Sequence, residues 1–333
     1  MKNVIGILCV VLLLFQSYEV NAAESDTQKA VLITGATTGI GRVAAEHLAA
    51  NGYFVYAGAR KASDMEELNK IENIQAVRLD VTIQEEIDAA VEHIQSEGRG
   101  LWGLVNNAGV NVVGPLIEFD DDDFDFLFDV NVKGVFSVTK AFAPLIIESQ
   151  GRIVNISSVS GIGTGAAYGP YSMTKHAIEA FTDALKEELE VTGVSVAGVE
   201  PGNYSSAIGL TRCKRMLAKA DAGASQYWAE LMKDHIDYCK ERISPDYESS
   251  APEPVAVAAA VEHALFAAEP RAKYLVTPSR GAAGWITWSL VADLLDYNTD
   301  AEYGFTRDEI IDLIDREIDY RAGNEDAFKD LMD

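Results

Sequence analysis

The chain has 333 residues, 48% hydrophobic and 24% charged, and its mean hydropathy of +0.01 is typical of a globular protein with a large core. Its 52 Asp and Glu against 27 Lys and Arg give a net charge of −25, which disfavours binding to nucleic acid or anionic lipid. With five His and three Cys, and no Cys pair at metal-ligand spacing, we expect no metal site.

Residues 1–22 have the pattern of a secretory signal peptide. A cationic start precedes an apolar run of 12 residues at positions 4–15, and small residues at positions 20–22 are typical of a cleavage site. At about 1.5 Å per residue this run is too short for an apolar bilayer core of about 30 Å. We therefore expect export, to a periplasm or a lumen, by a cleaved signal peptide. The alternative is membrane association through an uncleaved N-terminal segment.

Two cysteines remain after such cleavage, Cys213 and Cys239, 26 positions apart. In an oxidising compartment they would form a disulfide; otherwise they are two unrelated small buried residues.

Short apolar runs alternate with helical patterns between residues 30 and 199. The runs that predict strands lie at residues 30–34, 53–58, 76–79, 103–106, 152–156 and 195–199. The helical patterns lie at residues 41–50, 83–95, 124–149 and 171–191. In the second of these helices, Ile83, Ile87, Val91 and Ile94 share one face. This alternation predicts an α/β fold, a single Rossmann-type doubly wound parallel sheet with helices on both faces.

A glycine-rich turn follows the first predicted strand and opens the first helix. In this turn, TGATTGIG, the residues Gly35, Gly39 and Gly41 would let the backbone approach a pyrophosphate, and the helix N-terminus supplies N–H donors. The turn by itself is also compatible with a simple tight connection, but its strand–turn–helix context favours a dinucleotide site.

The second predicted strand ends in Gly58-Ala59-Arg60-Lys61, where a ribose-binding carboxylate would be expected. An arginine at this position binds a 2′-phosphate, whereas a carboxylate would repel it. Arg60 therefore predicts NADP(H) as the preferred cofactor, with NAD(H) as the alternative if Arg60 is only a solvated surface residue.

Tyr171 and Lys175 are spaced to lie on one helix face, and Ser158 ends a predicted strand. A lysine ammonium beside a phenol lowers the pKa of the phenol toward working pH, and Ser158 can hydrogen-bond the same substrate oxygen. A Tyr-x-x-x-Lys pair alone is more often surface decoration of a helix.

Asparagines mark two further positions. Asn107, followed by Ala108 and Gly109, can tie adjacent strands together where a ring would lie against the backbone. Asn131 is unfavourable inside a helix unless it bonds another group, the alternative being a helix bend with a bound water.

Together these motifs resemble the classical short-chain dehydrogenase/reductase family over about residues 28–206. TGATTGIG, NNAG, VNVKG, ISS, YSMTK and VEPG occur in the order and spacing of the family. The resemblance implies that Tyr171 is the general acid/base, that Lys175 holds the nicotinamide ribose and tunes Tyr171, and that Ser158 positions the substrate oxygen. Asn131 would complete a water-linked proton relay.

The resemblance also implies a set of cofactor contacts. Asp80 matches the adenine-side acid, and Pro201-Gly202 matches the nicotinamide-side turn, after which Ser206 replaces a usual threonine. Thr38 stands where some NADP-dependent members carry a basic residue. The implied contacts are Gly35, Thr37, Thr38, Gly39, Ile40, Gly41, Arg60, Asp80, Val81, Asn107, Ala108, Gly109, Tyr171, Lys175, Pro201, Gly202 and Ser206.

The implied activity is hydride transfer between the nicotinamide and the carbonyl or carbinol carbon of a small molecule. The motifs are most similar to the retinol and 17β-hydroxysteroid dehydrogenase branch, which favours a lipophilic, steroid-, retinoid- or lipid-like substrate. The alternatives are a lyase or epimerase using the same Tyr–Lys pair, and a non-catalytic nucleotide sensor or scaffold. Relatives assemble through helices like those at 124–149 and 171–191, so we expect a homodimer or homotetramer.

The family pattern divides the chain into a Rossmann domain at residues 28–280, which includes a substrate-lid segment at 203–251, and a C-terminal extension at 281–333. In the lid, Trp228, Leu231 and Met232 share a helix face that either walls a lipophilic pocket or packs on the core or a sister subunit. The apolar residues of 284–297 predict an interfacial helix or a cap over the site. Residues 293–333 contain 14 acidic and 4 basic residues, which predicts one or two solvated acidic helices.

Overall fold

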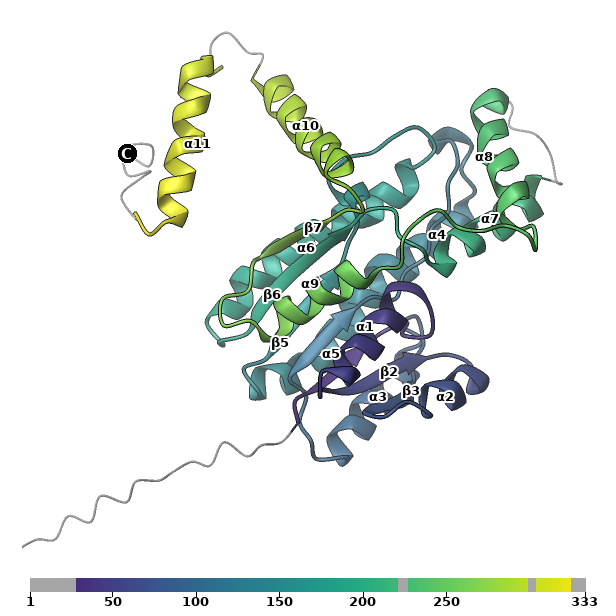
Figure 1. Ribbon diagram of the computed structural model, residues 1–333, viewed down its shortest axis with the longest axis vertical. Coiled ribbons are helices and arrows are strands. Elements are labelled where there is room, and N and C mark those ends of the chain that lie inside the picture. The colour runs from purple at the N-terminus through teal and green to yellow at the C-terminus, as the bar shows by residue number, and fades with distance from the viewer. Residues whose placement is uncertain (1–27, 221–226, 299–303, 325–333) are drawn as a thin grey trace, which may run out of the picture.

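Seven parallel strands form one central sheet in the computed structural model, which describes residues 28–220, 227–298 and 304–324 (Figure 1). Their order is β3-β2-β1-β4-β5-β6-β7, so the chain winds outward in both directions from β1. Val31 of β1 pairs with Val55 of β2 on one side and with Gly103 of β4 on the other. The strands are β1 (Ala30–Ile33), β2 (Phe54–Ala59), β3 (Ile74–Arg78), β4 (Gly103–Asn106), β5 (Arg152–Ile156), β6 (Ser195–Pro201) and β7 (Lys273–Val276).

Helices cover both faces of this sheet. The side chains of β1 alternate between two apolar cores, Val31 and Ile33 in one and Leu32 in the other, because successive strand residues point to opposite faces. Helices α1 (Gly39–Ala50), α2 (Ala62–Leu68) and α9 (Val255–Phe266) contribute to the first core. Helices α3 (Gln84–Ser96), α5 (Gly134–Glu148) and α6 (Gly169–Glu190) contribute to the second. The predicted doubly wound sheet is confirmed.

The apolar face predicted for α3 is buried except at its first residue, Ile83. Ile87 and Ile94 are each 1% exposed, whereas Ile83 is 39% exposed. Ile83 is the residue that precedes the helix, with extended backbone dihedrals, so the helix begins one residue later than the face predicts.

The helix predicted over 124–149 is a continuous run with one irregular turn. Helix α4 (Asp121–Phe128) passes through a π-helical turn, η2 (Asp129–Lys133), into α5. Of the residues that the structure describes, only this run, Asp121–Glu148, is long and apolar enough to cross a membrane by length and composition. Half of its most apolar stretch is buried, and Phe142 and Ile146 lie fully inside the second core. It is therefore a core helix of the sheet domain.

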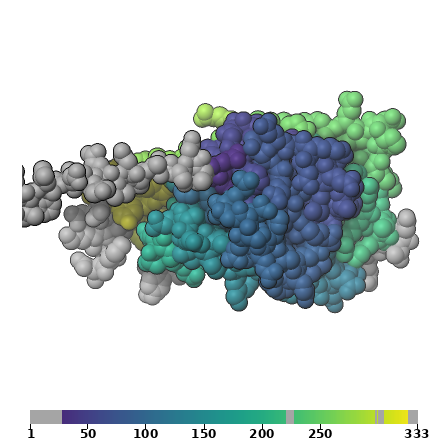
Figure 2. All heavy atoms as spheres, turned by 90° about the horizontal axis from the view of Figure 1, so that it is seen from below, coloured from purple at the N-terminus to yellow at the C-terminus, as the bar shows by residue number. Residues whose placement is uncertain are grey.

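The C-terminal half adds helices at two opposite ends of the body, with α8 (green) at one end and α11 (yellow) at the other (Figure 2). Two of these helices are α7 (Ala207–Ala220) and α8 (Ala229–Arg242), and a disulfide between Cys213 and Cys239 joins them. At the other end lie α10 (Arg280–Tyr297) and α11 (Arg307–Arg321). Two short 3-10 turns complete the described elements, η1 (Leu116–Glu118) and η3 (Val159–Gly161).

Both helices of the C-terminal extension are largely exposed. Trp285 and Trp288 of α10 are 55% and 65% exposed, and Thr306 and Glu309 form a capping box at the start of the acidic α11. The predicted signal peptide at residues 1–22 lies outside the described residues, as does the end of the chain after residue 324.

Candidate active site

A cavity of about 790 Å³ lies at the carboxyl ends of the central strands. β1 and β4 are neighbours in the sheet, and the connections after them leave in opposite directions, which makes this edge the topological switch point where α/β folds bind ligands. The cavity extends from Arg60, after β2, past the turn after β1 to Tyr171 on α6 and on to α7 and α8.

The glycine-rich turn after β1 is packed too closely to carry side chains. Gly35 and Gly39 have φ values of +64° and +57°, which favour glycine. A Cβ on Gly39 would lie 2.8 Å from Cβ of Ser206, and one on Gly41 would lie 2.3 Å from Nδ2 of Asn107. The turn, which lines the cavity beside the N-terminus of α1, therefore requires glycine at these positions.

Asn107 and Thr34 join the ends of β1 and β4, as predicted for Asn107. The side-chain amide of Asn107 donates to the carbonyl oxygens of Thr34 and Gly35 at 2.9 and 3.0 Å. The hydroxyl of Thr34 accepts from the backbone N–H groups of Asn107 and Ala108 at 3.0 and 2.9 Å. These four bonds fix the floor of the cavity at the switch point.

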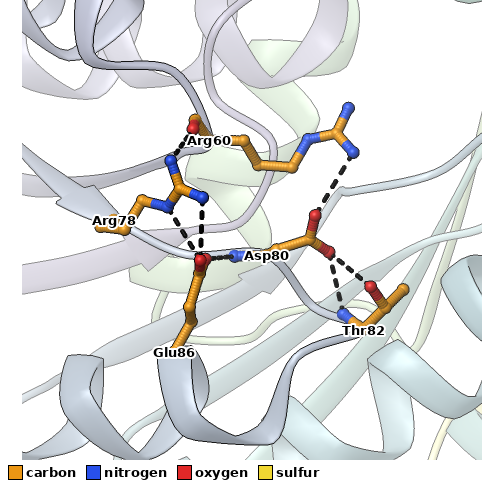
Figure 3. Close-up of polar contacts among 5 residues, drawn as sticks. All are labelled: Arg60, Arg78, Asp80, Thr82 and Glu86. Carbon is orange, nitrogen blue, oxygen red and sulfur yellow. Dashed lines mark hydrogen bonds and ion pairs between the residues drawn. The ribbon is translucent and has the colours of Figure 1, made fainter.

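Two arginines, Arg60 after β2 and Arg78 at the end of β3, lie close to Asp80 (Figure 3), and Arg60 of the two lines the far end of the cavity. Arg60 is 65% exposed and its Nη1 lies 3.4 Å from Oδ2 of Asp80. Arg78 is held more firmly, because it donates to Glu86 at 2.9 Å and to the backbone oxygen of Arg60. Burial raises the pKa of Asp80, but hydrogen bonds from Thr82 and the charge of Arg60 outweigh it and lower the pKa. Arg60 is thus the more exposed of the two cations and has fewer contacts.

Tyr171, Ser158 and Lys175 face the cavity together from α6 and the end of β5. Burial raises the pKa of Tyr171 to about 12, and a hydrogen bond with the Ser158 side chain opposes this rise. Burial lowers the pKa of Lys175 to about 8, against the charge of Glu179.

The expectation that Lys175 lowers the pKa of Tyr171 toward working pH is not met here. The ammonium of Lys175 donates to the carbonyl oxygen of Ile156 at 3.0 Å and lies 5.8 Å from the centroid of the Tyr171 ring. Burial of the phenol outweighs the two effects that lower its pKa, the hydrogen bond with Ser158 and the charge of Arg212.

Asn131 lies behind the cavity wall, in the π-helical turn η2. Its side chain accepts from the N–H of Val110 at 2.8 Å, donates to the carbonyl oxygen of Val110 at 2.9 Å, and donates to Oγ1 of Thr174 at 3.0 Å. These bonds satisfy a buried amide and tie the loop after β4 to α6. Asparagine is unfavourable inside a regular α-helix, and these bonds explain why the helix changes to a π-helical turn at this residue.

Most of the residues predicted from sequence for the site lie together around this cavity. All of the predicted contacts line it except Gly41 and Asn131, which are buried directly behind the wall. The predicted residues on the wall are Gly35, Thr37, Thr38, Gly39, Ile40, Arg60, Asp80, Val81, Asn107, Ala108, Gly109, Ser158, Tyr171, Lys175, Pro201, Gly202 and Ser206.

The substrate end of the cavity differs from the sequence-based expectation. Trp228, Leu231 and Met232 are not among the residues that line it, and Met232 instead packs against the cluster around the disulfide. This favours the packing alternative for that helix face. Part of the wall is formed by polar and cationic side chains that belong to no sequence motif: Tyr168, Arg212, His235, Tyr238, Arg242 and Tyr247. None of the described residues of α10 lines the cavity, so a cap role for that helix gains no support.

The short chain dehydrogenase family model matches residues 29–215. The mitochondrial D-beta-hydroxybutyrate dehydrogenase of Bos taurus is 38% identical over 264 residues, 74% of this chain and 76% of that protein. Retinol dehydrogenase 16 of Homo sapiens is 34% identical over 77% of this chain and 81% of its own. Estradiol 17-beta-dehydrogenase 2 of Mus musculus is 31% identical over 88% of this chain and 79% of its own.

Solved structures with the same fold include complexes with both nicotinamide cofactors. A short-chain dehydrogenase from Streptomyces avermitilis superposes with a TM-score of 0.67 at 27% identity, covering 82% of this chain and 97% of that one. An alcohol dehydrogenase from Thermococcus sibiricus, complexed with 5-hydroxy-NADP, gives 0.53 at 26% identity over 55% and 79%. A 3-ketoacyl-(acyl-carrier-protein) reductase from Brucella melitensis, complexed with NADH, gives 0.52 at 28% identity over 54% and 77%.

Proposed function

Because the chain belongs to the short-chain dehydrogenase family and is an oxidoreductase of alcohol groups, we propose that it transfers a hydride between NADP(H) and a carbonyl or carbinol carbon with Tyr171 as the general acid/base. The observation that carries this proposal is the position of the phenol. Tyr171 and Ser158 face one cavity, whose other end is the glycine turn after β1.

The residues around the cavity fit a dinucleotide. Gly35 and Gly39 line the cavity, and a side chain is not accommodated at either, because a Cβ would meet Ala108 or Ser206 within 2.9 Å. The backbone of this turn and the N-terminus of α1 would hold the pyrophosphate, and Asp80 and Arg60 would flank the adenosine. When bound, the nicotinamide ring supplies or accepts the hydride.

The chain's own groups would manage the proton. With its pKa raised to about 12, Tyr171 holds its proton at neutral pH and can donate it to the oxygen of a carbonyl substrate during reduction. Ser158 would donate a second hydrogen bond to the same oxygen, where negative charge develops. Lys175, whose Nζ is anchored to the carbonyl oxygen of Ile156 at 3.0 Å, would hold the ribose beside the phenol. Asn131, whose side chain binds the backbone of Val110 in the loop after β4, would complete a water-linked proton relay from these groups.

The proposed preference for NADP(H) rests on Arg60. Its side chain is 65% exposed, and within the part of the chain that the structure describes its guanidinium has one ion pair, a long contact of 3.4 Å to Asp80, so it can turn toward a 2′-phosphate. Arg78 is already engaged by Glu86 and supports the backbone of Arg60.

The substrate proposed from the branch resemblance is a lipophilic alcohol or ketone. Retinol dehydrogenase 16 and estradiol 17-beta-dehydrogenase 2 are named for substrates of that kind, whereas the relative from Bos taurus is named for a hydroxybutyrate. Aromatic rings at the substrate end, those of Tyr168, Tyr238 and Tyr247, offer apolar contact to either.

The experiment that tests this function is a titration of the protein with NADPH and with NADH, followed by nicotinamide fluorescence, and then a panel of ketones and alcohols. Tight binding of NADPH, weaker binding of NADH and turnover of a ketone would support the proposal. A preference for NADH would overturn the cofactor assignment alone. Binding of neither nucleotide, or binding without turnover across the panel, would favour a non-catalytic sensor.

We also propose export of the mature chain through the predicted signal peptide. The disulfide between Cys213 and Cys239 supports this compartment, because such bonds persist where the redox environment is oxidising. Mass spectrometry of the protein from its native compartment tests both points, since a mature N-terminus near residue 23 and an intact disulfide are expected. A retained residue 1 with free thiols would contradict export.

A homo-oligomer built on α5 and α6 is our proposal for the assembly. Phe136 of α5 is 53% exposed, and its ring centroid lies 6.4 Å from that of Phe181 on α6. Both rings line an apolar hollow that also includes Phe128 and Ile178. Light scattering of the parent and of Phe136→Asp tests it. The parent is expected at twice or four times the chain mass and the variant at a lower mass, whereas a monomeric parent would refute the proposal.

A further inference from the structure

Arg212 of α7 brings a positive charge to the substrate end of the cavity. Its Nη1 donates to the hydroxyl of Tyr168 at 3.0 Å, and Tyr168 is the N-cap residue of α6, three residues before Tyr171. The charge of Arg212 also acts on the phenol of Tyr171, where it lowers the pKa against the larger effect of burial. Arg212 therefore lies within electrostatic reach of the reacting oxygen.

Within residues 28–220, 227–298 and 304–324, no carboxylate forms an ion pair with Arg212, and its Nε is buried without an acceptor. The neighbouring cations of the same helix differ. Arg215 pairs with Asp123, and Lys219 pairs with Asp123 and Asp120 at 2.7 and 2.9 Å. On α7, Arg215 and Lys219 are therefore neutralised and the exposed Lys214 faces solvent, whereas the cation that lines the cavity, Arg212, has no counter-charge among the described residues.

A second arginine adds to this positive end. Arg242 of α8 donates to the backbone oxygen of Ser206 at 3.3 Å and lies 5.0 Å from the ring of Tyr247, and its Nε is also buried without an acceptor. Among the described residues that line the cavity, Asp80 is the only acid, and it lies at the adenosine end beside Arg60. The substrate end therefore holds positive charge that a bound anion would neutralise.

The guanidinium of Arg212 is also held in place. The next residue, Cys213, is bridged to Cys239 of α8, and the Tyr168 hydroxyl fixes one end of the guanidinium. A fixed guanidinium presents parallel N–H donors that match the two oxygens of a carboxylate. Preorganised donors lose little conformational entropy on binding, which strengthens such a contact.

We propose that the substrate is a hydroxy acid or its oxo acid, whose carboxylate is bound by Arg212 while its reacting oxygen lies against Tyr171 and Ser158. This inference rests on the proposed function and narrows its substrate to an anionic alcohol or ketone. Aromatic rings of Tyr168 and Tyr238, beside Arg212, would contact the carbon chain of the acid.

The test uses two readouts on the full-length mature protein. In the first, the complex with NADP⁺ is titrated with butanoate and with its neutral analogue butanamide, by calorimetry. In the second, NADPH oxidation is followed with 3-oxobutanoate and with its methyl ester. The variants are Arg212→Met, the conservative Arg212→Lys, and Lys214→Met, which removes an exposed cation from the same helix and serves as the matched control.

We expect the parent and the Lys214→Met control to bind butanoate more tightly than butanamide and to favour the acid over the ester in kcat/KM. Arg212→Met should lose roughly 10- to 100-fold in both measurements with the acid, because a hydrogen bond to a charged group is removed, and change little with the ester. Arg212→Lys should recover part of the loss. Thermal melting of each variant confirms that it is folded.

The inference is overturned if butanoate and butanamide bind alike, or if Arg212→Met leaves the preference for the acid intact. Turnover of the ester with NADPH in that case would leave the proposed function standing. Selective binding of butanoate that Arg212→Met abolishes, without turnover of any ketone, would instead support the anion site and count against the proposed function.

Discussion

The disulfide between Cys213 and Cys239 offers a sharp test of how the substrate end is held. The two cysteines are 0% and 1% exposed and pack with Val113 and Met216, and the bond joins the helix of Arg212 to the helix of His235. Paired Cys213→Ala and Cys239→Ala substitutions, or reduction of the parent, remove this connection.

The expected size of the effect follows from the 26-residue separation of the cysteines. A crosslink across a loop of this length lowers the conformational entropy of the unfolded segment. In the chain-entropy relation this stabilises the folded segment by about 3.5 kcal/mol at 25 °C. Ion pairs from Arg215 and Lys219 to Asp123 attach α7 to α4 independently of the disulfide, so α7 keeps a contact to the sheet domain. Loss of the disulfide should therefore raise the equilibrium constant for local opening of α7 and α8 by up to roughly 400-fold, without global unfolding of the chain.

Amide hydrogen exchange measures this directly. Amides of α7 and α8 should exchange faster after reduction, while those of β1 and β4 in the sheet keep their protection. The kcat/KM for the substrate should fall in parallel, because Arg212 loses its fixed position. Unchanged exchange in α7 and α8, with complete reduction verified by mass spectrometry, would refute this reasoning, and so would equal loss of protection in the sheet.

Three further predictions concern other parts of the molecule. Arg60→Ala should weaken NADPH binding about tenfold and leave NADH binding unchanged, measured by fluorescence titration, because a charge-assisted contact to the 2′-phosphate is lost; equal losses would contradict this. Burial, reinforced by the charge of Glu179, raises the pKa of Glu200 from 4.5 to about 8. Between these values the folded chain keeps a proton that the unfolded chain has released, so this group makes stability fall as pH rises from about 5 to 8. Glu200→Gln should flatten that fall in melting temperature, and an unchanged slope would refute the assignment. Asn131→Ala should cost about 2–3 kcal/mol in urea unfolding, because both backbone groups of Val110 lose their partners; a cost below about 0.5 kcal/mol would show that water replaces the amide.

Most of the sheet could be predicted because its signals are local. Two strands, Gly103–Asn106 and Arg152–Ile156, have the bounds that their apolar runs indicate. A buried parallel strand is a continuous apolar run, and the turn that follows each strand is marked by small or polar residues. The glycine turn and the Tyr-x-x-x-Lys spacing belong to the same local class of signal.

Features that depend on distant partners could not be predicted. The π-helical turn at Asn131 is needed because Val110, 21 residues earlier, requires partners for its backbone. The high pKa of Tyr171 results from burial in the assembled fold, which helical spacing does not reveal.

The substrate end was also hidden from sequence reasoning. The segment around Arg212 carries no family motif, and its apolar pattern predicts a helix without indicating which of its side chains face the cavity. Helix α7 contains no acidic residue, so spacing along the helix does not distinguish Arg212 from Arg215 or Lys219. Only the folded chain brings Asp123 to the latter two and leaves Arg212 at the cavity.

The central claim is that Tyr171 is the general acid/base of an NADP(H)-dependent oxidoreductase. The most direct measurement compares Tyr171→Phe with the parent in two ways, by turnover with the best substrate of the panel and by NADPH titration. The account predicts that turnover falls roughly 10²- to 10⁴-fold while NADPH affinity changes less than about threefold, because only the proton donor is removed. Turnover equal to that of the parent, with NADPH still bound, would contradict it.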